Sequence, residues 1–171
     1  MKSSSRSLAI AAAVVALGVG GVLAYQALNR YPTMPEVRYT LLDGKAASTA
    51  QLRGKVTLVN FWATSCTTCM HEMPQIVATH EKFKDRGFQT LAVAMDYDPP
   101  AYVANYAESR KLPFSVAIDN TGAIARSFGD VRLTPTTYVI NKRGEIVKRY
   151  VGEPDFNALH ALLEQLLAES A

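Results

Sequence analysis

Two cysteines, Cys66 and Cys69, carry the most reactive chemistry in this sequence of 171 residues, and the chain has no others. They follow a mostly apolar run, residues 56–61, that is typical of a buried strand, and a helix-like segment follows them. The nucleophile in thiol chemistry is the thiolate, and the free N–H groups and positive dipole at a helix N-terminus lower a thiol pKa to about 3.5–7.5. The position of the pair therefore predicts redox chemistry, with Cys66 as the exposed attacking thiol and Cys69 as the thiol that resolves a mixed disulfide.

Other roles for such a pair need neighbours that this chain mostly lacks. A c-type haem site requires a His directly after the second cysteine, where Met70 stands, and a zinc site requires about four ligands, of which His71 is directed to another side of the helix. A structural disulfide stays open, although a bridge that closes so short a loop stabilises little. Two functional alternatives also stay open: Cu(I) binding by both thiolates, with Met70 and Met73 nearby, and thiol peroxidase activity. The sequence predicts no resident metal or cofactor.

The elements that position the cysteines alternate along the chain. Strands are expected at residues 37–42, 56–61, 88–95, 115–118, 136–140 and 146–150. Helices are expected from the cysteines to about residue 86, at residues 98–111 and 123–128, and from Pro154 onward. Because strands and helices alternate before a final antiparallel hairpin, this order predicts an α/β fold with a mixed central sheet covered by helices on both faces.

The first thirty residues differ from the rest of the chain. Residues 8–28 carry no charge, and these 21 positions match the roughly 20 apolar residues that a helix needs to cross a membrane. We expect residues 1–30 to be a cytoplasmic stub and a membrane anchor, with a cleaved signal peptide as the alternative. Lys2 and Arg6 favour a cytoplasmic N-terminus, which places a domain of residues 31–171 on the far side of the membrane. Anchor and leader alike deliver that domain to a compartment that permits disulfides.

Composition excludes several classes of function. Hydrophobic residues make up 49% of the chain and charged residues 19%, which is typical of a folded rather than a disordered protein. Three of the 18 basic residues lie in the first thirty positions, so the remaining 15 balance the 15 acidic residues. A near-neutral domain lacks the basic surface of a nucleic-acid binder, and we expect no nucleic-acid partner.

The stretch FWATSCTTC at residues 61–69, followed by MHEMP at residues 70–74, resembles the active-site segment of thioredoxin-fold proteins. The apolar N-terminus, the extra N-terminal strand region and the EMP sequence make the chain most similar to the TlpA/ResA-like branch. That branch comprises membrane-anchored or exported bacterial thiol-disulfide oxidoreductases. The resemblance covers roughly residues 35–168 in the order of elements, and it implies a thioredoxin-like fold.

The resemblance also implies a substrate-binding edge beside the cysteine pair, which it makes a redox-active disulfide. In LTPTTYVI, residues 133–140, Pro135 matches the cis proline that faces the cysteines in thioredoxin folds. We expect it to leave the backbone of Thr134 free to pair with an extended substrate segment. Trp62 matches a family tryptophan before the cysteines and is the other residue expected to bind substrate.

A further catalytic residue implied by the resemblance is Glu72, three residues after Cys69 on nearly the same helix face. The matching Glu of the TlpA/ResA-like branch has a role in redox function. We therefore expect a partly buried carboxyl with a raised pKa that exchanges protons with the Cys69 sulfur. Asn60 stands where thioredoxins carry a buried Asp, and because an amide takes up no proton, Glu72 is the better candidate base.

The function implied by the resemblance is that of a reductant of selected protein disulfides outside the cytoplasm, of the kind used in cytochrome c maturation or copper-site assembly. Its expected partners are protein thiol and disulfide substrates, together with a membrane electron donor of the thioredoxin-reducing type that restores the dithiol. Its expected location is the bacterial inner membrane, crossed once through residues 8–28, with the domain facing the periplasm.

Overall fold

The computed structural model describes residues 18, 20, 21 and 31–170. The chain divides into two units, Met1–Tyr31 and Pro32–Ala171, and the second of these contains the sheet and the helices described below. The membrane anchor predicted at residues 8–28 lies outside the described residues apart from positions 18, 20 and 21. Within the described ranges, no helix has the length and apolar character needed to span a lipid bilayer.

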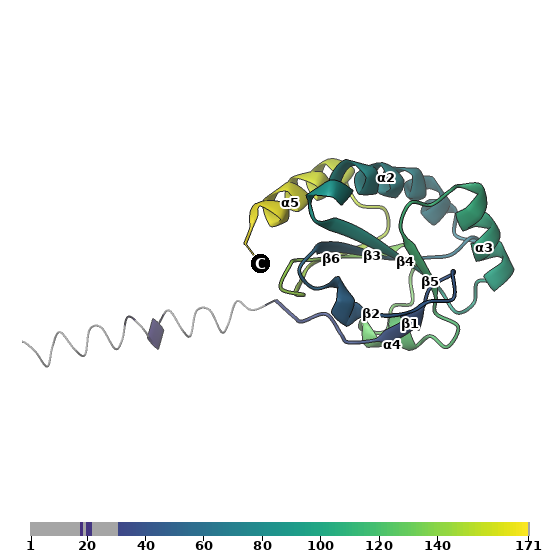
Figure 1. Ribbon diagram of the computed structural model, residues 1–171, viewed down its shortest axis with the longest axis horizontal. Helices are drawn as coiled ribbons and strands as arrows, with labels where there is room; N and C mark the ends of the chain where they lie inside the picture. Colours follow the sequence, from purple (N-terminus) through teal and green to yellow (C-terminus); the bar gives the residue numbers. More distant parts are fainter. Residues whose placement is uncertain (1–17, 19, 22–30, 171) are drawn as a thin grey trace, which may run out of the picture. The chain divides into compact units, whose positions relative to one another are not determined.

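A five-stranded mixed sheet forms the centre of this unit (Figure 1). Its strands are β3 (Val56–Trp62), β4 (Phe88–Ala94), β5 (Ser115–Ile118), β6 (Thr136–Ile140) and β7 (Ile146–Val151). They lie in the order β5-β4-β3-β6-β7, in which β4 is parallel to β3 and β5, whereas β6 is antiparallel to β3 and β7. The mixed sheet predicted from the sequence is therefore confirmed.

A smaller two-stranded sheet precedes the large one. β1 (Arg38–Thr40) and β2 (Ala46–Ser48) pair antiparallel, and Gly44 in the turn between them has a φ of 82°, which glycine adopts without strain. The sequence predicts a single strand at residues 37–42. The structure differs because the chain turns at Asp43 and returns as β2.

Residues 32–48, called the N-terminal segment below, are attached to both edges of the large sheet. An isolated antiparallel bridge joins Leu41 to Ala117 in the edge strand β5. A second bridge joins Thr33 to Glu145, next to the other edge strand, β7. The segment therefore runs across the sheet and is fastened at each side.

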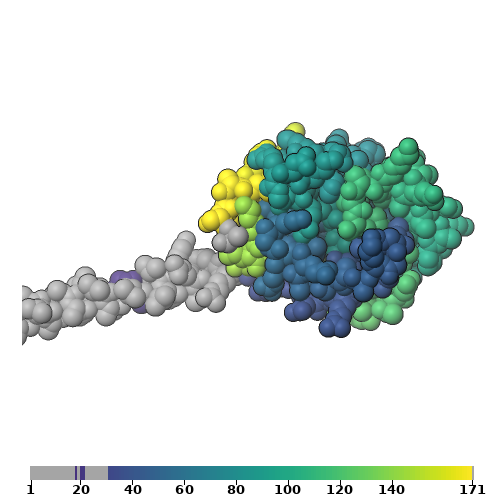
Figure 2. All heavy atoms as spheres, viewed as in Figure 1, coloured from purple at the N-terminus to yellow at the C-terminus, as the bar shows by residue number. Residues whose placement is uncertain are grey.

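Helices cover both faces of the large sheet, as predicted. They are α2 (Thr67–Phe83), α3 (Pro100–Ser109), α4 (Ala123–Ser127) and α5 (Phe156–Ala168), with 3-10 turns η1 (Thr49–Leu52) and η2 (Lys84–Arg86). In Figure 1, α2 and α5 lie above the sheet and α3 lies at its right-hand side, whereas α4, β1 and β2 lie below it. Figure 2 shows the same arrangement in space-filling form, with the dark blue N-terminal segment along the lower side and the teal of α2 along the upper.

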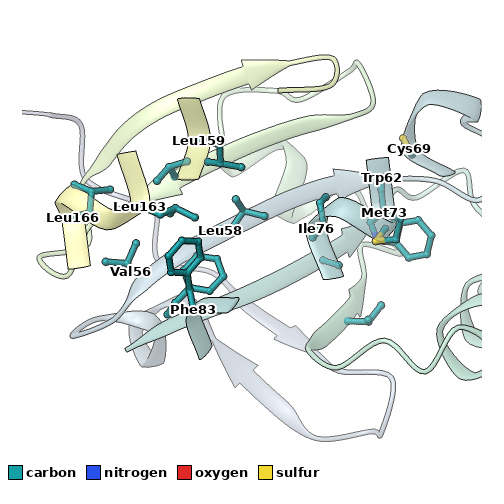
Figure 3. Packing of buried hydrophobic residues seen from close by; sticks show 14 of the residues in the cluster. Val56, Leu58, Trp62, Cys69, Met73, Ile76, Phe83, Leu159, Leu163 and Leu166 are labelled. Carbon is teal, nitrogen blue, oxygen red and sulfur yellow. The ribbon is translucent and has the colours of Figure 1, made fainter. Parts of the chain in front are cut away.

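Alternating side chains of β3 divide the core into two layers. Leu58 and Trp62 belong to the cluster formed with α2 and α5, whereas Val59 and Phe61 belong to the cluster on the α4 side. Figure 3 shows the first cluster, with leucines of α5 beside the strand. All seven residues of β3 are buried, so the strand that leads toward Cys66 is a rigid support for the site.

Candidate active site

The two cysteines form a disulfide at the N-terminus of α2, and their Cα atoms are 5.2 Å apart. Cys66 is the N-cap residue and is half-buried, whereas Cys69 has no exposed surface. The backbone N–H of Cys69 donates to the Sγ atom of Cys66 over 3.1 Å. After reduction, an N–H in this position stabilises negative charge on the accessible sulfur. Cys66 is thus the more exposed of the two cysteines, as expected if Cys66 attacks the substrate and Cys69 resolves the mixed disulfide.

The loop before Cys66 is held by a buried aspartate. The backbone N–H of Thr64 donates to Oδ2 of Asp98 over 2.6 Å, and the Thr64 hydroxyl donates to Oδ1 over 2.5 Å. Asp98 is only 2% exposed. Sequence reasoning did not find this contact. The available signal was an acidic residue just beyond the end of β4, because adjacent parallel strands such as β3 and β4 end at the same edge of a sheet.

Glu72 lies in the first turns of α2 and has no exposed surface. The Nδ2 atom of Asn60 donates to its Oε1 atom over 2.9 Å and also donates to Thr137 Oγ1 over 2.9 Å. Burial raises the pKa of Glu72 to about 7; the bond from Asn60 opposes this shift, and the negative charge of Glu153 adds to it. The expectation of a raised pKa is confirmed, and the side chain gains or loses a proton near neutral pH.

The peptide bond between Thr134 and Pro135 is cis, as the family resemblance implies. The antiparallel register of β3 and β6 pairs Phe61 with Thr136, so the two residues before Thr136 lie beside the start of the loop that carries Cys66. The N–H and C=O groups of Thr134 make no hydrogen bond to any residue that the structure describes. This backbone is therefore available for pairing with another chain.

Trp62 lies beneath the site rather than on its surface. The side chain has no exposed area and packs against Tyr106 with ring centroids 5.4 Å apart. Its Nε1 atom has no hydrogen-bond partner among the described residues. The burial of Trp62 therefore favours a packing role, whereas the family resemblance implies a contact with substrate.

In residues 31–170, no three or more His, Cys, Asp and Glu side chains are grouped so that they could hold a metal ion. His71, two residues after Cys69, pairs instead with Glu153, with 3.0 Å between Nδ1 and Oε2.

Comparisons with known proteins agree with this geometry. Residues 32–163 match the Redoxin family. The thiol-disulfide oxidoreductase ResA of Bacillus thuringiensis subsp. konkukian is 33% identical over 132 residues, which cover 77% of this chain and 75% of ResA. The solution structure of a protein described as a thioredoxin from Neisseria meningitidis is 41% identical, with a TM-score of 0.75 over 81% of this chain and 93% of that one. A thiol:disulfide interchange protein from Chlorobium tepidum is 28% identical, with a TM-score of 0.74 over 81% and 98% of the two chains.

Proposed function

The chain belongs to the Redoxin family and is a thiol-disulfide oxidoreductase, and from this premise we propose that it reduces selected protein disulfides outside the cytoplasm. The observation that carries the proposal is the difference between the two sulfurs. Cys66 is half-buried and its sulfur accepts a hydrogen bond from a backbone N–H, whereas Cys69 is completely buried. An accessible sulfur that favours the thiolate suits attack on a protein disulfide, and a shielded thiol is reserved for the intramolecular step.

The reaction proceeds by two exchanges. In the reduced protein, the thiolate of Cys66 attacks one sulfur of the substrate disulfide, and the other substrate sulfur leaves as a thiolate. Cys69 then attacks the Cys66 sulfur of this mixed disulfide, which closes the Cys66–Cys69 bond and releases the second substrate thiol. Two electrons pass from the protein to the substrate, and the protein ends in the disulfide form that the structure shows.

The proton of the Cys69 thiol needs an acceptor, because only the thiolate attacks. Glu72 is the group we assign to this step. It lies one helical turn after Cys69, it is buried as Cys69 is, and its pKa of about 7 allows it to be ionised before the transfer and protonated after it. Asn60 acts through Glu72, because its amide holds one carboxyl oxygen in place.

Substrate binding is assigned to the loop before β6. The backbone groups of Thr134 have no partner among the described residues and can pair with an extended segment of a substrate, which adds a short strand at this edge. Pro135 follows directly and places that backbone beside the loop of Cys66. A substrate disulfide within the paired segment would then face the attacking sulfur.

The place of action and the electron donor complete the proposal. The uncharged residues 8–28, preceded by Lys2 and Arg6, support a single membrane anchor with the domain of residues 31–171 facing the periplasm. A membrane protein of the thioredoxin-reducing type would restore the dithiol. Substrates of the cytochrome c maturation or copper-site assembly type fit a reductant that works in an oxidising compartment.

Reduction of insulin disulfides by the reduced protein tests the activity, and trapping tests the order of the two exchanges. A Cys69→Ala variant should remain joined to its substrate through Cys66, because the resolving thiol is missing. The Cys66→Ala variant should neither reduce insulin nor trap a partner. Reactive thiols at both positions of the wild type, combined with no reduction of any protein disulfide, would contradict the proposal.

A further inference from the structure

The loop between β4 and α3 touches both sides of the proposed site through two neighbouring residues. Asp98 binds the backbone and hydroxyl of Thr64, two residues before Cys66. Tyr97 reaches the other side, where its hydroxyl lies 3.1 Å from Oγ1 of Thr134. One short loop therefore connects the segment that carries the attacking sulfur with the segment proposed to hold the substrate.

The contact between Asp98 and Thr64 consists of two hydrogen bonds. Both carboxyl oxygens are used, one by an N–H group and one by a hydroxyl group, and both donors come from Thr64. Asp98 is only 2% exposed, and a buried polar side chain is stable only where hydrogen bonds replace those that it made to water. The loop is itself fastened to β3, because the N–H of Met95 donates to the carbonyl of Trp62 over 3.0 Å. Thr64 thus has little freedom to move away from the end of β4.

The Tyr97 contact differs, because the tyrosine is 54% exposed. Because a side chain so exposed to solvent adds little to the packing of the core, we attribute the role of Tyr97 to the hydrogen bond of its hydroxyl. The partner in that bond is Thr134, whose backbone N–H and C=O groups make no hydrogen bond within the described part of the chain. The bond restrains the side of the loop where a substrate strand would pair.

We propose that Asp98 and Tyr97 are positioning residues, which together fix the distance between the Cys66 sulfur and the backbone of Thr134. The inference rests on the proposed function, because it assumes that a substrate pairs with Thr134. Attack on a disulfide requires a defined geometry of three sulfurs, that of Cys66 and the two of the substrate. A small displacement of the loop of Cys66 or of the loop of Thr134 therefore slows the reaction. A small disulfide that does not use Thr134 has no such requirement. The proposed effect is therefore specific to extended substrates.

Two probes with the same leaving group separate these cases. One is 5,5′-dithiobis(2-nitrobenzoate), and the other is an eight-residue Ala/Thr peptide whose single cysteine is joined to 5-thio-2-nitrobenzoate. With reduced protein, Cys66 attacks either probe and releases the coloured thiolate; Cys69 then closes the protein disulfide and releases the second thiol. Each rate constant is divided by that of free glutathione with the same probe, which removes the intrinsic reactivity of the probe. The peptide preference is the normalised rate constant for the peptide probe divided by that for 5,5′-dithiobis(2-nitrobenzoate).

The wild type should show a peptide preference well above one. Asp98→Ala should lower it about tenfold and Tyr97→Phe about threefold, since misplacement by an ångström or less is enough for losses of this size. Asp98→Asn should retain most of the preference, because the amide oxygen accepts from the Thr64 N–H while the amide N–H₂ group donates to the hydroxyl. Asp43→Ala and Tyr102→Phe, at exposed residues outside these contacts, are the matched controls and should leave the preference unchanged.

The outcomes distinguish the inference from the function on which it rests. A wild type without peptide preference contradicts the proposed pairing with Thr134, and this result is read before any variant. If the wild type has the preference and folded Asp98→Ala and Tyr97→Phe keep it, the positioning role is overturned. Equal losses with both probes also overturn it. Should Asp98→Ala fail to fold, as judged by its circular dichroism, Thr64→Val and Tyr97→Phe decide the question, because each removes one hydroxyl and leaves the backbone intact.

Discussion

Glu72 has no exposed surface, and only one of its carboxyl oxygens has a hydrogen-bond partner among the described residues. Removal from water disfavours the charged form of a carboxyl, and the single bond from the Asn60 amide offsets part of this effect. The resulting pKa of about 7 is unusually high for a glutamate, and strongly shifted pKa values are common among active-site residues. At the residue scale, the site thus combines an accessible sulfur, a buried sulfur and a buried acid that is half-ionised near neutral pH.

Replacement of Glu72 by Gln tests this acid through the pH dependence of stability. The pKa is raised from 4.5 to about 7 on folding, so the folded state holds the proton more tightly. Its stabilising contribution is complete below about pH 4.5 and is lost as the pH rises through about 7. Between pH 4.5 and 8, the free energy of unfolding of the wild type should fall by up to about 3 kcal/mol relative to Glu72→Gln. Urea unfolding of the oxidised proteins measures it, and parallel pH profiles would show that the acid is not perturbed.

At the scale of the elements, local sequence patterns predicted most of the scaffold. The apolar run at residues 56–61 became β3, and the hairpin around residues 141–144 joins β6 to β7, because periodicity and turn residues are local signals. The contacts that shape the site are not local. Asn60 and Glu72 are 12 residues apart, and Thr64 and Asp98 are 34 apart, so these bonds depend on how α2 and β4 pack against β3. Resemblance to a family supplied Pro135, but it did not supply Asp98.

The capping of α5 offers a test at this scale that leaves the chemistry untouched. Asp155 accepts hydrogen bonds from the N–H groups of Asn157 and Ala158 at the start of the helix. Asp155→Ala should lower the free energy of unfolding by about 1 kcal/mol, whereas Asp155→Asn, which also caps well, should lower it much less. Urea unfolding compares the three proteins. Disulfide exchange rates should be equal in all of them, and a loss of stability as large in Asp155→Asn as in Asp155→Ala would contradict the capping role.

At the scale of the whole molecule, the large sheet is braced by the N-terminal segment, which bridges to β5 at one edge and next to β7 at the other. Residues 1–30 contain three basic residues and no acid, whereas the charges of the rest of the chain balance. A neutral domain behind a basic, apolar N-terminus is the distribution expected for a tethered domain rather than for one attracted to anionic surfaces.

Fractionation tests the proposed tether. The full chain, expressed in bacteria, should sediment with membranes and resist extraction by alkaline carbonate, because a 21-residue uncharged segment partitions into the bilayer. A chain that begins at Pro32 should stay in the supernatant. A protease added from the periplasmic side should degrade the domain of the full chain. Release of the full chain by carbonate, or protection of the domain from that protease, would contradict the proposed anchor and orientation.

In the proposed mechanism, the N-terminus of α2 makes Cys66 a reactive thiolate. Alkylation of the reduced protein by iodoacetamide across a pH series, with the modified residue identified by mass spectrometry, measures the pKa of this thiol directly. We expect Cys66 to be modified before Cys69 and to titrate clearly below about 8.5, the ordinary pKa of cysteine. A Cys66 that titrates at about 8.5, or that resists alkylation while Cys69 reacts, would show that Cys66 is not the attacking thiolate.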